Sequence, residues 1–449
     1  MCIEPGLMGK IKRKVNLMDP AIITLCVLAV AAFLFVTELI PLAVTAMAAC
    51  TALGILGVLP SKQVYAGLSN STVVLFGGMF VIGAAMFKTG LAETIGLAVV
   101  HKAGTGEVKL MGAVMLVTIC LSSVSSNTGT VACLMPVVIG IANAAHVAPS
   151  KELMPLAIAA NVGGTITMIG TPPNVIVTGA LNAAGLPSFG FFEFALIGIP
   201  LSVVVLAYML TIGRKTIPIH EVGEMDEEAV QAAKEEAGAS DDSAPKSKSK
   251  MIISGLIMCG VVVAMALNLK TVPLQTAAVT GAILCVITGC LKEKEAYAGI
   301  DWVTIFLFAG MLSVATAMDK TGAGKLIADT VVGMMGSNPN PIILCAVLYL
   351  ISNVLTQFMS NTASAALLAP IGISIAQTIG ADPKPVLMAI GIAASMAYAT
   401  PMATPPNTLV LGPGSFTFND YVKVGVPLCV ICFIVSVIII PIFWPFFPG

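Results

Sequence analysis

Two polar stretches decide the fold: residues 122–130 read SSVSSNTGT, and residues 356–364 read TQFMSNTAS. Each contains Ser-Asn-Thr, and the two copies lie 234 positions apart. Each copy is followed by Thr-Pro-Pro-Asn, at Thr171–Asn174 and at Thr404–Asn407, with an offset of 233 positions. Apolar composition alone does not place two different polar motifs at nearly the same offset. The pattern therefore predicts an internal duplication.

A longer alignment upstream of these motifs supports the duplication. With a shift of 232 positions, Pro41–Gly90 aligns with Pro273–Gly322 without a gap, and 20 of the 50 positions are identical. We therefore expect the two halves of the chain to share one fold.

The composition indicates the class of protein. The chain has 449 residues, of which 57% are hydrophobic and 10% are charged, and its mean hydropathy is +0.99. Soluble domains carry about 25% charged residues, so a soluble domain, a disordered chain and a coiled coil are excluded. The net charge of -1 gives no basis for binding nucleic acid. We expect an all-α, multi-pass integral protein of the plasma (inner) membrane, in contact with lipid.

The spans and the polar segments define the domains. Because a bilayer core of about 30 Å needs about 20 apolar residues per helix, the sequence predicts eight full spans. They lie at about 20–39, 41–59, 72–90, 194–212, 251–269, 272–291, 302–319 and 422–442. The polar, basic segment 1–19 precedes repeat 1 (20–212), and repeat 2 (251–449) follows the linker 213–250. The linker holds 15 of the 45 charged residues, and the distribution of Lys and Arg places it in the cytoplasm.

Each repeat also contains two irregular regions. In the first, two apolar runs flank Ser-Asn-Thr, over 110–147 and 342–379, and we expect a re-entrant helical hairpin. The alternative is two ordinary spans joined by a turn outside the membrane. The second region, 153–184 and 385–411, carries the two prolines, which break a helix within the membrane. Such backbone is tolerated only beside protein or a water-filled cavity.

These regions predict the topology. When the broken helix counts as one span, each repeat crosses the membrane five times. An odd number of crossings inverts the second repeat relative to the first. Inverted repeats with broken helices at the bilayer midplane are typical of secondary transporters.

The repeated motifs are candidate binding elements without charge. All four motifs lie in stretches that contain no Asp, Glu, Lys or Arg, namely 110–150, 153–192, 330–381 and 385–419. Helix N-termini, hydroxyls and amides can bind an anion, while carbonyl and Asn oxygens can bind Na⁺. For one Ser-Asn-Thr, a simple helix N-cap would explain the residues, and a simple kink would explain Pro-Pro. The duplication of both motifs favours a binding site.

In these motifs the sequence resembles the divalent-anion:sodium symporters, which include sodium/dicarboxylate, sodium/citrate and some sulfate carriers. The resemblance rests on the paired motifs and on Glu38–Ala46, ELIPLAVTA, and runs from about residue 20 to the C-terminus. It implies a homodimer in which a transport domain of hairpins and broken helices moves like an elevator against fixed scaffold helices. Many members have an additional N-terminal span that is not found here.

The resemblance also implies the site residues. Sodium site 1 would use Ser122, Ser126, Asn127 and the carbonyl of Gly170, and sodium site 2 would use Thr356, Asn361 and the carbonyls of Met359 and Ala403. The substrate would contact Ser126, Asn127, Thr128, Ser360, Asn361, Thr362, Thr404 and Pro405.

The leading hypothesis is a secondary transporter that couples Na⁺, the transported co-ion, to small di- or tricarboxylates such as succinate, malate, fumarate or citrate. The alternatives are a Na⁺-independent anion exchanger and a sulfate or phosphate carrier of the same fold. An enzyme would need a catalytic dyad or metal ligands at membrane depth, and the sequence indicates neither of these nor an organic cofactor.

Overall fold

The computed structural model describes residues 19–103, 106–220, 228, 231, 247–267, 271–335 and 340–447. The basic segment 1–19, apart from its last residue, and most of the linker 213–250 lie outside the described residues. The described chain is helical, and no strand occurs in it. Seven of its helices are long and apolar enough to cross a membrane.

The helices of repeat 1 follow the predicted order. They are α2 (Pro20–Thr37), α3 (Leu42–Ile55), α4 (Ser61–Val64), η1 (Ala66–Ser69), α5 (Ser71–Lys88), α6 (Leu91–Ala103), α7 (Glu107–Ser122), α8 (Asn127–Ala144), α9 (Ser150–Gly163), α10 (Pro172–Ala183), α11 (Ala195–Tyr208), η2 (Met209–Gly213) and α12 (Arg214–Thr216).

Repeat 2 runs through the same series. Its helices are α14 (Lys248–Ala266), α15 (Leu274–Ile287), α16 (Glu293–Ala298), α17 (Trp302–Thr321), α18 (Ala323–Met335), α19 (Pro341–Thr356), α20 (Asn361–Thr378), α21 (Pro383–Ser395), α22 (Pro405–Leu411) and α23 (Phe418–Phe443). Among the helices longer than six residues, α6 and α18 were not assigned from the sequence.

The two repeats pack against each other through reciprocal contacts. Helix α3 packs on α17 while α15 packs on α5, and α8 contacts α22 while α20 contacts α10. Glycines permit the first pair of contacts. A Cβ atom on Gly78 would lie 2.8 Å from the backbone of Ala278, and one on Gly310 would lie 2.7 Å from that of Ala46. Since both pairs are related by the 232-position shift, the molecule has a pseudo-two-fold arrangement, and the predicted fold class is confirmed.

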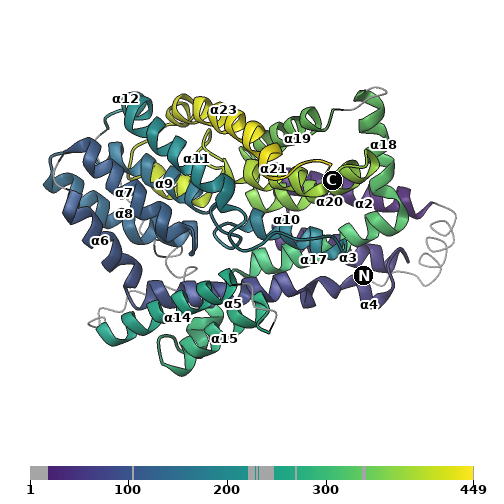
Figure 1. Cartoon of the computed structure of the whole chain (residues 1–449), viewed down its shortest axis with the longest axis horizontal. Helices are drawn as coiled ribbons and strands as arrows, with labels where there is room; N and C mark the ends of the chain where they lie inside the picture. The colour runs from purple at the N-terminus through teal and green to yellow at the C-terminus, as the bar shows by residue number, and fades with distance from the viewer. Residues whose placement is uncertain are drawn as a thin grey trace, which may run out of the picture.

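The helix contacts define two groups around the motifs. Figure 1 shows α5, α14 and α15 together along one edge of the molecule, with α23 at the opposite edge. The hairpin helices pack on the broken helices, with α7 and α8 on α9, and α19 and α20 on α21. We call α3, α5, α15 and α17 the scaffold group, and α7–α10 with α19–α22 the core group.

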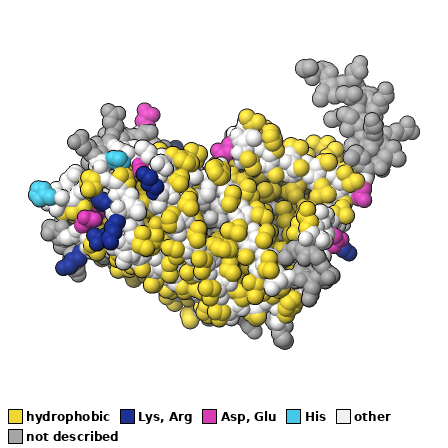
Figure 2. All heavy atoms as spheres, turned by 90° about the horizontal axis from the view of Figure 1, so that it is seen from above, with side chains coloured by type: hydrophobic (Ala, Val, Ile, Leu, Met, Phe, Trp, Pro, Cys, Tyr) yellow, Lys and Arg dark blue, Asp and Glu magenta, His cyan; other side chains and the backbone are white. Residues whose placement is uncertain are grey.

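The surface suits a lipid environment. Figure 2 shows hydrophobic side chains over most of the visible face, with Lys and Arg gathered towards one end. Large apolar side chains such as Val203, Leu256 and Ile287 are exposed. Because water would oppose such exposure, the molecule is an integral membrane protein.

The hairpin turns are short. Helix α7 ends at Ser122 and α8 begins at Asn127, where Ser126 is the N-cap and its Oγ accepts a hydrogen bond from the Gly129 N–H at 3.3 Å. Helices α19 and α20 repeat this turn between Thr356 and Asn361. Both Ser-Asn-Thr motifs therefore lie at the first turn of a helix.

The prolines have a different position from the one expected. Instead of breaking a helix in its middle, Pro172 and Pro405 begin α10 and α22, where a missing N–H costs no hydrogen bond. The irregular chain precedes them. The Asn of each motif holds that chain, because the Asn174 amide donates to the Thr167 carbonyl at 2.9 Å and the Asn407 amide donates to the Thr400 carbonyl at 3.0 Å.

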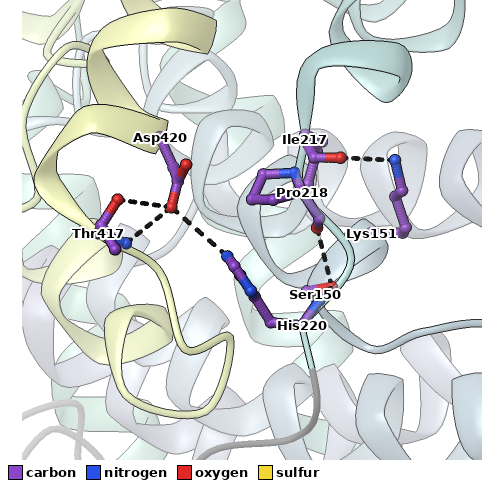
Figure 3. A network of polar contacts seen from close by, with 7 residues as sticks. All are labelled: Ser150, Lys151, Ile217, Pro218, His220, Thr417 and Asp420. Atoms are coloured by element: carbon purple, nitrogen blue, oxygen red, sulfur yellow. Dashed lines mark hydrogen bonds and ion pairs between the residues drawn. The ribbon is translucent and has the colours of Figure 1, made fainter.

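Two polar clusters tie the ends of α9 and α21 to chain segments at the ends of α11, α12 and α23. In the first (Figure 3), the Lys151 ammonium donates to the Ile217 carbonyl at 2.6 Å, and His220 lies 3.5 Å from the Asp420 carboxylate. In the second, Glu193 accepts from the Lys384 ammonium at 3.1 Å and from the Trp444 indole at 2.6 Å. These contacts hold α9 and α21 at their outer ends.

Candidate functional site

A cavity of about 700 Å³ lies between the two repeats. Both Ser-Asn-Thr tips and both Thr-Pro-Pro-Asn loops line it. All eight predicted substrate residues are among the lining residues: Ser126, Asn127, Thr128, Ser360, Asn361, Thr362, Thr404 and Pro405. The fold thus brings together four motifs that are distant in the sequence.

The opposite wall of the cavity belongs to the scaffold group. Helix α5 contributes Phe76, Met79 and Phe80, and α17 contributes Leu307 and Thr304. This wall is mainly apolar, whereas the tips and loops supply hydroxyls and amides. The cavity therefore lies at the boundary between the core group and the scaffold group.

Polar groups converge behind the first tip. The Ser122 hydroxyl lies 2.5 Å from the Asn127 carboxamide oxygen and donates to the Ala160 carbonyl at 2.8 Å. In the alternative orientation of the same amide, its nitrogen donates to the carbonyls of Ala160 at 3.2 Å and Gly170 at 3.1 Å. Ser122, Asn127 and Gly170, all predicted for sodium site 1, therefore lie together.

The second tip repeats this geometry. The Thr356 hydroxyl lies 2.5 Å from the Asn361 carboxamide oxygen and donates to the Ala394 carbonyl at 2.7 Å. Of the other residues predicted for sodium site 2, Ala403 lines the cavity, and Met359 is buried directly before the tip. The sequence did not identify the carbonyls of Ala160 and Ala394, because nothing in the local pattern distinguishes them from other helical carbonyls.

Two carboxylates also line the cavity, both from the scaffold side. Glu38 is exposed at the end of α2 in a left-handed conformation with φ of 49°. Asp301 caps α17 by accepting from the Thr304 N–H at 2.9 Å. The negative charge around the cavity therefore lies away from the tips.

The two Ser-Asn-Thr tips present hydroxyls, amides and helix N-termini, which are neutral dipoles. The N-termini of α8, α10 and α20 meet at the cavity, because Asn127, Pro172 and Asn361 line it. Helix N-termini carry partial positive charge and attract anions. In the described part of the chain, no group of three or more His, Cys, Asp or Glu residues could hold a metal ion.

Paired hairpins and broken helices around a cavity between two inverted repeats define a secondary transporter. The profile of the family described as "Citrate transporter" matches residues 32–383 and 362–448. The chain therefore belongs to the citrate transporter family, and it is a transporter rather than an enzyme. This finding confirms the resemblance stated from the sequence.

Individual relatives agree with this assignment. The chain is 30% identical to an uncharacterized transporter of Haemophilus influenzae, over 94% of this chain and 91% of the relative. It is 25% identical to the sodium-dependent dicarboxylate transporter SdcS of Staphylococcus saprophyticus, over 95% of this chain and 86% of the relative.

Solved structures share the fold. The YdaH transporter of Alcanivorax borkumensis has a TM-score of 0.62 at 13% identity, with 93% of this chain and 100% of that chain covered. MtrF of Neisseria gonorrhoeae has a TM-score of 0.59 at 14% identity, with 96% and 97% covered.

Proposed function

We propose that the protein couples Na⁺ to the movement of a small di- or tricarboxylate, such as succinate, malate, fumarate or citrate. The observation that carries this proposal is the cavity lined by both Ser-Asn-Thr tips. A dianion placed there meets hydroxyls, amides and three helix N-termini. The relative named as a sodium-dependent dicarboxylate transporter, which matches over nearly the whole chain, supports the same substrate class.

Sodium ions would bind behind the tips. Site 1 would use Ser122, Ser126, Asn127 and the Gly170 carbonyl, and site 2 would use Thr356, Asn361 and the carbonyls of Met359 and Ala403. Oxygen ligands of this kind are the ones that half-helix ends offer to Na⁺ in other transporters. The hydroxyl, amide and carbonyl groups converging within 2.5–3.2 Å at each tip support these assignments.

We propose an elevator movement, in which the core group carries the cavity across the membrane while the scaffold group stays fixed within a homodimer. The position of the cavity supports this idea, because its walls come from both groups. The apolar wall formed by Phe76, Met79 and Phe80 would give the tips a surface along which to move without breaking hydrogen bonds.

Uptake of radiolabelled succinate, citrate and sulfate into proteoliposomes, with and without an inward Na⁺ gradient, tests the proposal. We expect carboxylate uptake that requires Na⁺, and the variants Asn127→Ala and Asn361→Ala should reduce it to background. Uptake that is independent of Na⁺ but stimulated by internal anion would instead show an exchanger. Uptake of sulfate alone would show a different substrate class.

A further inference from the structure

Asn161 connects the two repeats beside the cavity. It lies in α9, its side chain is 1% exposed, and it lines the cavity. Its amide nitrogen donates to the Thr404 hydroxyl at 3.1 Å and to the Asn407 carboxamide oxygen at 3.2 Å. Both partners belong to repeat 2, so a residue of one repeat contacts the binding loop of the other.

The orientation of this amide is determined by its neighbours. The Asn407 nitrogen donates to the carbonyls of Ala397 at 2.9 Å and Thr400 at 3.0 Å, so its oxygen faces Asn161. Asn161 must therefore present its nitrogen, since an oxygen in that place would face the oxygen of Asn407. The second hydrogen of the same nitrogen is directed to Thr404.

The hydrogen bond from Asn161 orients the Thr404 hydroxyl. Because its oxygen accepts from Asn161, its own proton is available to another acceptor. No acceptor for this proton occurs among the residues that the structure describes, and Thr404 lines the cavity. The Thr404 hydroxyl is therefore prepared to donate to an anion.

The Thr-Pro-Pro-Asn loop of repeat 1 receives no equivalent contact from repeat 2 in the described structure. The position that corresponds to Asn161 is Ser395, whose hydroxyl donates to the Gly391 carbonyl at 3.1 Å within its own helix. The carboxamide oxygen of Asn174, which corresponds to Asn407, has no partner in the described structure. The loop that carries Thr171 is therefore not oriented in the same way.

Asn161 combines two buried hydrogen bonds from its nitrogen with one unsatisfied oxygen. Its carboxamide oxygen is buried without a hydrogen-bond partner, which is unfavourable for folding. A small apolar residue would avoid this cost but would leave the buried Asn407 oxygen without its donor. The two hydrogen bonds of the Asn161 nitrogen therefore hold the loop of repeat 2 and orient the Thr404 hydroxyl.

We propose that Asn161 is a positioning residue that directs the Thr404 hydroxyl to a substrate carboxylate, so that the two loops hold the anion unequally. This inference rests on the proposed function, because it takes the ligand of the cavity to be a carboxylate anion.

The test measures succinate uptake by the purified full chain in proteoliposomes. For Asn161→Ser, which introduces the residue found in repeat 2, we expect the KM for succinate to rise about tenfold, as for one lost hydrogen bond to a charged group. The maximal rate and the Na⁺ concentration for half-maximal uptake should change less than about twofold. Ser395→Ala is the matched control, and its KM should remain that of the wild type.

A double-mutant cycle tests whether Asn161 acts through Thr404. Combining Asn161→Ser with Thr404→Val should raise the KM no further than Thr404→Val alone. Additive effects would overturn the proposal, and so would an unchanged KM in Asn161→Ser. If the wild type takes up no carboxylate, the proposed function fails, and this inference fails with it.

A second comparison leaves Asn161 intact, in case its replacement prevents folding. Thr404→Val should raise the KM about tenfold, whereas Thr171→Val at the equivalent position of repeat 1 should raise it less than about threefold. Equal effects of the two substitutions would overturn the proposed asymmetry while leaving carboxylate transport established.

Discussion

At the scale of single residues, the hydroxyl behind each tip offers a direct test of the sodium sites. Thr356→Ala removes the hydroxyl that lies between Asn361 and the Ala394 carbonyl. We expect the Na⁺ concentration for half-maximal uptake to rise about tenfold or more, because a buried oxygen ligand is lost. The relative uptake of succinate and citrate should change little, since Thr356 lies behind the tip and is not among the residues that line the cavity.

Thr356→Ser is the matched control for this experiment. It keeps the hydroxyl, and Ser122 shows that repeat 1 uses serine at the equivalent position with similar contacts. Its Na⁺ dependence should therefore be that of the wild type. If Thr356→Ala keeps the wild-type Na⁺ dependence as well, Thr356 is not a sodium ligand.

Residue patterns predicted the tips but not their partners. Ser-Asn-Thr and Thr-Pro-Pro-Asn were visible because they interrupt apolar sequence twice at one offset. Asn161 and Asp301 were not identified, because Asn161 is a single polar residue within an apolar helix and Asp301 looks like an ordinary helix cap. Their proximity to the cavity depends on contacts between repeats, which no local pattern records.

At the scale of helices, the crossing of α5 and α15 depends on Gly78. A Cβ atom there would lie 2.8 Å from the Ala278 backbone, whereas one on the neighbouring Gly77 would meet nothing within 4 Å. Gly78→Val should therefore destabilise the protein by about 1–3 kcal/mol, the usual cost of overpacking. Thermal unfolding in detergent measures this effect. Equal midpoints for Gly78→Val and Gly77→Val would contradict the packing argument.

The helix order was largely predictable, since apolar length determines most spans. The spans expected at 20–39 and 72–90 correspond to α2 and α5. Helices α6 and α18 were missed because they are only 13 residues long and carry charged residues among their apolar ones. The helix start at Pro172 was also missed, because a proline pair is compatible with both a kink and a first turn.

The inverted arrangement of the hairpins can be tested with single cysteines. Asn143 and Gln377 lie at equivalent positions near the open ends of the two hairpins, and both are exposed. In a background without the eleven native cysteines, a membrane-impermeant maleimide should label Asn143→Cys only from the cytoplasmic side and Gln377→Cys only from the opposite side. Labelling of both from one face would show that the hairpins are not inverted.

At the scale of the whole molecule, the charges around the cavity disfavour the binding of an anion alone, and the binding of Na⁺ together with the anion would compensate for this. The core side of the cavity offers only neutral groups, and the scaffold side adds Glu38 and Asp301. Moving a dianion from water into a low-dielectric cavity of neutral dipoles has a large desolvation cost. Repulsion from the nearby carboxylates makes the binding of the anion alone still less favourable. Na⁺ ions behind the two tips would offset this cost. We therefore expect the cations and the anion to bind together.

The coupling between Na⁺ binding and anion binding can be measured. By linkage, Na⁺ and the anion must tighten each other's binding by the same factor, about 5–150-fold for typical coupled sites. Isothermal titration of the purified protein with succinate or citrate, across a Na⁺ series at constant ionic strength, measures the effect. K⁺ and choline should not replace Na⁺, because both are too large for a close cage of hydroxyls and carbonyls. An anion affinity that stays constant across the series would reject coupled binding and favour the Na⁺-independent exchanger.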